Sequence, residues 1–168
     1  MKKLLGLGLL LLAIVSCNDS QRYSQNSKEI DIVKATINHY DYQKWDSLVI
    51  NYADTAKVYY NTRDLYFTAK NLPEYHIKND SAFLTRAFED DRREYEMITD
   101  NNGKKWVNFW GIWKATLNDT DENFVIPVHL TLKFVDNKIV EEWGYYDRST
   151  LNAALTKIAD AEEDSEVE

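Results

Sequence analysis

Apolar residues near the start of the chain recur at the spacing of a helix. Four of them, three, four and three residues apart, share one face of a helix that begins after Ser27: Ile30, Val33, Ile37 and Tyr40. A second, shorter helix is predicted over residues 44–52. Its inward apolar side chains would be Trp45, Leu48, Val49 and Tyr52.

The middle of the chain predicts a strand, a loop and a third helix. Residues 55–61 are β-branched and aromatic, which favours a strand, and residues 62–73 show no clean period. Asn79, Asp80 and Ser81 can cap a helix whose apolar face would carry Phe83, Leu84, Ala87 and Phe88. The other face would be charged and solvated, with Arg86, Glu89, Asp90, Arg92 and Arg93.

The second half alternates between apolar and polar residues. Strands are predicted over residues 94–99, 105–117, 124–135 and 139–147, with polar turns between them. One face of the third of these would be apolar: Phe124, Ile126, Val128, Leu130, Leu132 and Phe134. Its other face would carry Pro127, His129, Thr131 and Lys133. These patterns predict an α+β domain in which three N-terminal helices pack on a curved antiparallel sheet.

The first sixteen residues have the layout of a secretory signal. Lys2 and Lys3 precede an apolar run that is too short to span a bilayer, and the run ends at Cys17, the only cysteine. Residues 14–17, Ile-Val-Ser-Cys, resemble the lipobox of bacterial lipoproteins. The resemblance implies cleavage before Cys17, acylation of its thiol with chains such as palmitate, and anchoring to a membrane of the cell envelope after export. The alternative is a free thiol or a disulfide to another chain.

These features divide the chain into four segments. Residues 1–16 are the predicted signal peptide, and 17–27 a lipidated, flexible tether. Residues 28–150 form the folded domain. Residues 151–168 are a short helical segment, with Leu151, Leu155 and Ile158 on one side, followed by an acidic disordered tail.

The charge of the chain argues against a nucleic-acid partner. Its net charge is −8, and loss of Lys2 and Lys3 with the signal peptide lowers it to −10. Phosphate backbones repel such a domain.

The domain resembles the nuclear transport factor 2-like superfamily and, within it, the SnoaL-like branch. The resemblance rests on residues 44–48 and 52–58, a helix-to-strand corner, and on residues 126–134 and 137–147, a final hairpin. It implies a sheet curled into a cone around a pocket that the helices close. This fold hosts isomerases, dehydratases, hydrolases and pure binding modules, so the resemblance does not choose a function.

Two catalytic constellations of this fold lack their parts here. Alignment on the corner places the base of ketosteroid isomerase at Tyr60, its oxyanion tyrosine at Thr36 and its oxyanion aspartate near Leu130, none of which has the required chemistry. The epoxide hydrolases of the fold use an Asp-Arg-Asp cluster inside the cone. No arginine is predicted at an inner strand position, because Arg63, Arg86, Arg92 and Arg93 fall on loops or helices and Arg148 follows the last strand.

No metal or cofactor site is predicted. The three histidines, His39, His76 and His129, lie far apart in the sequence and are expected on the surface, in a loop and on the outer face of the sheet. Asp54 and Asp147, at strand ends, could be an acid–base pair, or a cap and an ion-paired strand end. We expect no catalytic residue among them.

Aromatic residues are the most suggestive set. Six are candidate pocket residues: Tyr40, Trp45, Tyr60, Trp106, Trp110 and Trp143. Trp106 and Trp110 share a face of their strand, and Trp113 lies on the opposite one. The set is explained either by core packing plus an adhesive outer face, or by a pocket for an apolar or sugar-like ligand.

The sequence therefore predicts a membrane-anchored, non-catalytic binding module that holds a small apolar ligand or a protein partner. A homodimer through the outer face of the sheet, around His129, Thr131 and Lys133, is a further expectation. The alternative is an enzyme of the isomerase, dehydratase or hydrolase type with an unfamiliar acid–base constellation in the cone. Two or more ionisable groups in contact inside the cone would favour the enzyme.

Overall fold

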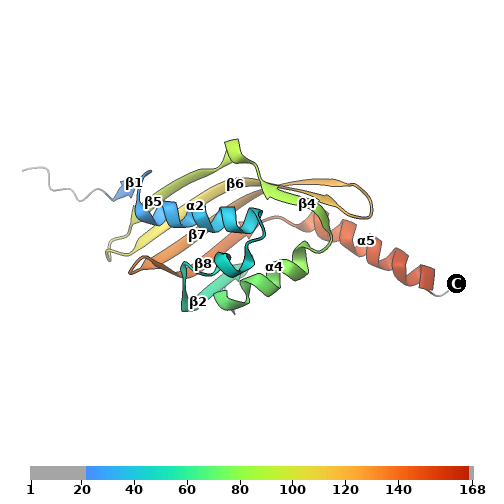
Figure 1. Cartoon of the computed structure of the whole chain (residues 1–168), viewed down its shortest axis with the longest axis horizontal. Coiled ribbons are helices and arrows are strands. Elements are labelled where there is room, and N and C mark those ends of the chain that lie inside the picture. The colour runs from blue at the N-terminus through green and yellow to red at the C-terminus, as the bar shows by residue number, and fades with distance from the viewer. Residues whose placement is uncertain (1–21, 167–168) are drawn as a thin grey trace, which may run out of the picture.

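Three helices cover one face of a curved, eight-stranded sheet (Figure 1). The computed structural model describes residues 22–166. The covering helices are α2 (Lys28–Asp41), α3 (Trp45–Leu48) and α4 (Leu72–Asp80). A last helix, α5 (Ser149–Glu166), follows the sheet and projects beyond it. The α+β class with three N-terminal helices on a curved sheet is thus confirmed.

The sheet runs in the order β1-β5-β6-β7-β8-β2-β3, and β4 also pairs with β6. Its strands are β1 (Tyr23–Ser24), β2 (Tyr52–Tyr60), β3 (Phe67–Thr68), β4 (Phe83–Phe88), β5 (Glu94–Thr99), β6 (Lys105–Leu117), β7 (Asn123–Val135) and β8 (Lys138–Tyr146). Two short 3₁₀ turns lie at Ala69–Asn71 and Asp90–Arg92. Every pairing is antiparallel except that of β2 with β8, which is parallel.

Helix α2 begins where the sequence predicts. The Ser27 hydroxyl accepts a hydrogen bond from the Ile30 N–H at 3.2 Å, which satisfies one of the free donors of the first turn. The predicted apolar face, Ile30, Val33, Ile37 and Tyr40, is buried against the sheet. The inner face of β7 is also as predicted: Phe124, Ile126, Val128, Leu130, Leu132 and Phe134 are all buried.

The third helix lies earlier in the chain than predicted. Residues 72–80 form α4, with Pro73 in its first turn, and residues 83–88 form strand β4. Arg86 and Phe88, two residues apart, both point inward, so the segment follows the two-residue period of a strand. Arg86 is therefore buried, and the expectation of a solvated charged helix face is wrong for this residue.

The ends of the domain also differ from the expectation. Tyr23 and Ser24, placed in the tether by the sequence, pair with β5. The second helix is only one turn long, because Tyr52 already belongs to β2. Residues 151–166, which the sequence analysis divided between a short helix and a disordered tail, belong to one continuous helix, α5.

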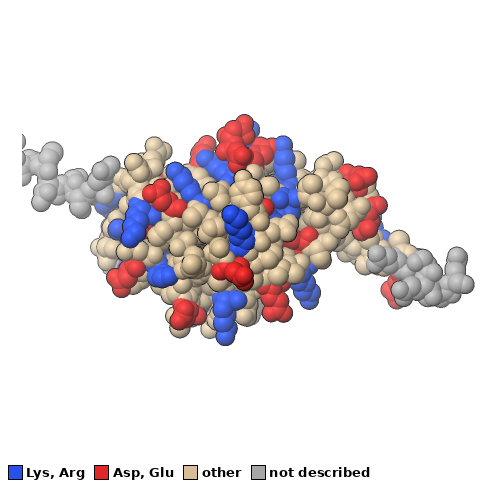
Figure 2. All heavy atoms as spheres, in the orientation of Figure 1, with Lys and Arg blue, Asp and Glu red and all other residues tan. Residues whose placement is uncertain are grey.

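Cys17 and the predicted signal peptide lie outside the described residues. Within residues 22–166, no helix is both long and apolar enough to cross a membrane. On the face that carries the helices, basic and acidic side chains are intermixed (Figure 2).

Candidate functional site

A cavity of about 120 Å³ lies between the three helices and the inner face of the sheet. Its volume is somewhat smaller than the cavity of about 150 Å³ that holds a benzene ring, so it is on the scale of a small molecule. Most of its wall is aliphatic or aromatic. The polar residues on the wall are Thr36, Tyr40, Tyr52, Tyr60, Tyr75, His76, Asn79, Asp80, Glu142, Tyr146 and Arg148.

A carboxyl group lies on this wall in contact with two phenols. Glu142 is only 3% exposed. Its Oε2 accepts a short hydrogen bond from the Tyr52 hydroxyl, and its Oε1 accepts one from the Tyr60 hydroxyl at 2.9 Å. Three ionisable groups from β2 and β8 thus meet inside the cone.

Burial controls the protonation of this cluster. It raises the pKa of Glu142, against the opposing effect of the hydrogen bonds from Tyr52 and Tyr60. Burial, reinforced by the nearby carboxylate, raises the pKa of both tyrosines well above its ordinary value. Tyr52 and Tyr60 therefore keep their protons at neutral pH and act as hydrogen-bond donors.

The contact depends on the parallel pairing of β2 with β8. Tyr60 lies opposite Gly144 in this pairing, and Tyr59 opposite Trp143. A Cβ atom at position 144 would lie 2.7 Å from Cδ1 of Tyr60, which is too close. Because Gly144 has no side chain, the Tyr60 ring can pack closely against the strand that carries Glu142.

A second buried pair lies beside the cavity. Nε of Arg86 is 2.8 Å from Oδ2 of Asp80, and the Arg86 side chain is 1% exposed. The pair is an ion pair without an aligned hydrogen bond, since neither atom has a hydrogen-bond partner within residues 22–166. Arg86 also donates to the Tyr40 carbonyl at 2.7 Å and lies over the Tyr40 ring. Burial raises the pKa of Asp80 to about 6, although Arg86 acts in the opposite direction.

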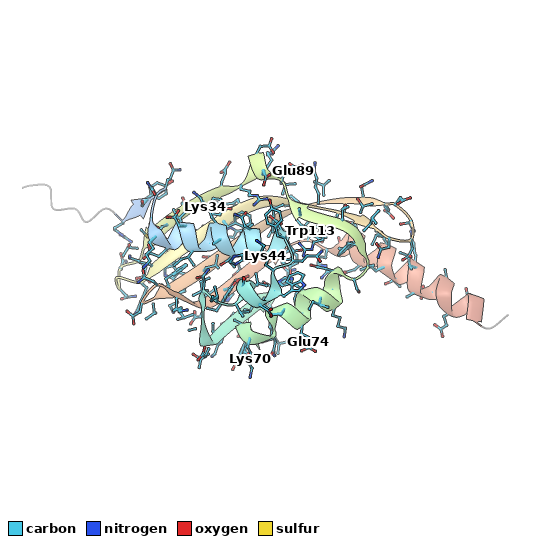
Figure 3. The ribbon with its side chains drawn as sticks, in the orientation of Figure 1. Lys34, Lys44, Lys70, Glu74, Glu89 and Trp113 are labelled. Carbon is cyan, nitrogen blue, oxygen red and sulfur yellow. The ribbon has the colours of Figure 1, made fainter. Side chains whose placement is uncertain are left out.

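An aromatic cluster joins this pair to the helices. His76 on α4 stacks on Trp45, and burial together with the Arg86 charge lowers its pKa to about 3, so the imidazole is neutral. The Trp113 indole donates to the Tyr40 hydroxyl at 2.9 Å, where the sheet meets the C-terminal half of α2 (Figure 3). The helix places His76 on the cavity wall, although the sequence analysis expected it in a loop.

The six candidate pocket residues divide between the two faces of the sheet. Tyr40 and Tyr60 line the cavity, and Trp45 backs it through His76. Trp106 and Trp110 lie on the outer face instead, because the odd-numbered residues of β6 are the ones that point inward. Trp143 also lies outside, where it stacks on Tyr59.

The positions equivalent to the ketosteroid isomerase residues do lie on the cavity wall. Thr36, Tyr60 and Leu130 all line it. The alignment therefore predicted which positions line the cavity, although their side chains differ from those that ketosteroid isomerase uses. Asp54 and Asp147 are exposed, and Asp147 instead accepts a hydrogen bond from the first residue of α5. Within residues 22–166, no group of three His, Cys, Asp or Glu residues could hold a metal ion.

Sequence reasoning missed Glu142 and Asp80. A bulge between Ile139 and Glu141 changes which residues of β8 point inward, so Glu142 points into the cone and Trp143 out of it. The available signal was an acidic residue within a strand. Its inward orientation could not be predicted, because the sequence does not reveal the bulge. Asp80 was taken as a cap, although it is the last residue of α4 and faces Arg86.

Comparison with known structures identifies this architecture. A candidate SnoaL-like polyketide cyclase from Shewanella denitrificans superposes with a TM-score of 0.60 at 16% identity, over 79% of this chain and 99% of that one. The chain has the nuclear transport factor 2-like fold. A candidate polyketide cyclase from Streptomyces antibioticus (TM-score 0.59, 13% identity, 77% and 99% coverage) shares this fold. A nuclear transport factor 2-like protein from Burkholderia xenovorans also shares it. Its TM-score is 0.55 at 12% identity, over 74% of this chain and 93% of that one.

The nuclear transport factor 2-like resemblance drawn from the sequence is thus confirmed for the fold. No family model and no curated protein matches the sequence. At these identities the nuclear transport factor 2-like fold alone is shared, so function has to be argued from the residues of the cone.

Proposed function

We propose that the domain is an enzyme that moves a proton on a small, largely apolar substrate held in the cone. The observation that carries this proposal is the contact of Glu142 with Tyr52 and Tyr60 on the wall of an apolar cavity. It meets the criterion set from the sequence, two or more ionisable groups in contact inside the cone. The proposal replaces the expectation of a non-catalytic module.

The cluster has the parts that proton transfer needs. The ionised carboxylate of Glu142 would accept a proton from a carbon or oxygen atom of the substrate. Once protonated, Glu142 has no negative charge and no longer needs a hydrogen bond from both tyrosine hydroxyls. Tyr52 or Tyr60 is then free to donate to the negative charge that develops on the substrate. The apolar wall excludes water and strengthens both interactions.

A chromogenic base-catalysed elimination tests this proposal. Nitrobenzisoxazole is a compact aromatic compound. Removal of its one acidic C–H proton breaks the N–O bond, and the electron pair leaves on oxygen as a coloured phenolate. We expect saturable elimination by the full-length chain, with a rate that rises with pH through a pKa above 4.5. Glu142→Gln should lower the rate roughly 100-fold or more.

Glu141→Gln is the matched control, since it removes a neighbouring carboxylate that points outward and pairs with Lys133. Its rate should equal that of the wild type. No acceleration by the wild type, or equal rates in Glu142→Gln and the wild type, would contradict the enzyme proposal.

Binding without chemistry is the second candidate, and one observation favours it. Both oxygens of Glu142 already accept a hydrogen bond, so the cluster could serve only to satisfy a buried carboxyl. Nitrobenzisoxazole that binds to the wild type without reacting would support this function.

We also propose that the domain is anchored to a membrane of the bacterial cell envelope through a lipid on Cys17. The support is the lipobox-like end of residues 14–17. Strand β1 begins at Tyr23. The six residues of chain from Cys17 to Tyr23 span at most about 20 Å when extended, so the lipid on Cys17 would hold the domain next to the bilayer.

A further inference from the structure

The outer face of the sheet, on the side away from the cone, carries a groove of about 690 Å³. Strands β1, β5, β6, β7 and β8 contribute to it. Aromatic and charged side chains both line it, among them Arg92, Glu94, Glu96, Trp110, His129 and Tyr145. This mixed wall differs from the largely apolar wall of the cone.

Three aromatic rings form a continuous stack along one side of the groove. Trp110, His129 and Tyr145 lie directly opposite one another on β6, β7 and β8. The first two ring centroids are 4.9 Å apart and the last two 6.1 Å, with interplanar angles of 26° and 16°. His129 covers one face of the indole. Trp110 is still 39% exposed, so part of the indole is open to a ligand.

Hydrogen-bonding groups line the groove together with Trp110. Glu94 is the residue paired with Trp110 across β5 and β6, and Glu96 follows on the same face of β5. Glu96 accepts one hydrogen bond, from Asn108 at 3.1 Å. Neither Arg92 nor Glu94 forms an ion pair within residues 22–166, so both have their polar atoms available.

We propose that this groove binds an oligosaccharide, one sugar ring of which stacks on Trp110. A pyranose ring has an apolar C–H face that suits an indole and a rim of hydroxyls that suits carboxylates and a guanidinium. A purely apolar ligand would strip water from Arg92, Glu94 and Glu96 without replacing their hydrogen bonds. A polyanion would be repelled by the two carboxylates.

The shape of the surface separates this occupant from the other two that a sheet can take. An extended peptide pairs with the edge of a sheet, whereas this groove crosses its face. A two-fold contact with a second copy, centred here, would place hollow against hollow and leave the space unfilled. The homodimer predicted from the sequence remains a prediction, which light scattering tests below.

Titration calorimetry of the full-length chain, in a detergent without sugar headgroups, tests the proposal. The probes are cellohexaose, xylohexaose and chitohexaose. We expect at least one hexasaccharide to bind, and Trp110→Ala to weaken its binding roughly tenfold or more. Glu94→Ala, at an exposed residue whose loss leaves the fold intact, should also weaken it.

Trp106→Ala is the matched control, because it removes another outer-face tryptophan of β6 that does not line the groove. The affinity of Trp106→Ala for the hexasaccharide should stay within about twofold of the wild-type affinity. Absence of binding by all three hexasaccharides overturns the proposal, as does binding that Trp110→Ala and Glu94→Ala leave unchanged. A dimer that Trp110→Ala converts to a monomer, seen by light scattering, overturns it in favour of a second copy.

Discussion

Neighbouring residues of β7 differ sharply in what they contribute to stability. Leu132 is 1% exposed and packs in the core, whereas Thr131 is half-buried on the outer face. Leu132→Ala should therefore lower the free energy of unfolding by about 2–5 kcal/mol, because it leaves a cavity. Thr131→Ala should lower it by less than about 1 kcal/mol. Urea unfolding measures both, and equal losses would show that the assignment of faces is wrong.

The buried carboxyl of Asp80 should give the stability of the fold an unusual pH dependence. Burial raises the pKa of Asp80 from 3.8 to about 6, so the folded state binds this proton more tightly than the unfolded state. The stabilisation is complete below about pH 4 and is lost as the pH rises through 6. We expect this group to lower the free energy of unfolding by up to about 3 kcal/mol between pH 4 and pH 7.

Urea unfolding of wild type and Asp80→Asn across that range measures this contribution. Asp80→Asn should lack this pH-dependent contribution to the free energy of unfolding. The variant also removes the charged partner of Arg86, which lowers stability equally at every pH. Asp54→Asn, at an exposed carboxyl, should follow the wild-type profile. Identical pH profiles for Asp80→Asn and wild type would refute the expectation.

At the scale of elements, α5 is attached to the domain mainly through its first turns. Leu151 is 1% exposed and lines the cavity, while Ala154, Leu155 and Ile158 are only partly buried. In proteins most of the stability of a helix comes from the tertiary packing of its apolar face. The order of α5 therefore depends on the contacts near Leu151.

Leu151→Ala should loosen the helix more than Leu155→Ala does. We expect amide hydrogen exchange within α5 to become faster in Leu151→Ala, with the protection of β6 and β7 retained. Leu155→Ala is the control, because this side chain keeps more contact with solvent. Equal exchange in the two variants would show that Leu151 is not the anchor.

At the scale of the whole molecule, the sheet separates two surfaces of different chemistry. Its inner face, with the helices, encloses a largely apolar cavity that contains one buried carboxyl cluster. Its outer face presents stacked aromatic rings beside charged groups. One sheet can serve both, because successive side chains of a strand point to opposite faces.

The proposed anchor makes a prediction about the location of the whole protein. Cys17 is the only cysteine in the chain, so no other thiol can be acylated. The Cys17→Ser protein should either move from the membrane fraction to the soluble fraction or accumulate as unprocessed precursor. Fractionation of cells followed by mass spectrometry measures this. A processed Cys17→Ser protein that stays with the membrane would exclude the lipoprotein interpretation.

The sequence by itself determined the elements whose periodicity is long and regular. The apolar stripe of α2, its Ser27 cap and the alternation of β7 each follow from local spacing, because burial of one face requires it. The likeness to the nuclear transport factor 2-like fold followed from the same segments. The wall positions Thr36, Tyr60 and Leu130 could be located for that reason.

Only the tertiary structure decided which polar residues enter the cone. The bulge in β8 turns Glu142 inward and Trp143 outward, and a bulge depends on how two strands pair rather than on the sequence of one. Arg86 is buried because Asp80 and the Tyr40 ring, from two different helices, offset the loss of its hydration. The sequence shows each of these residues, but their contacts join segments that are distant in the chain.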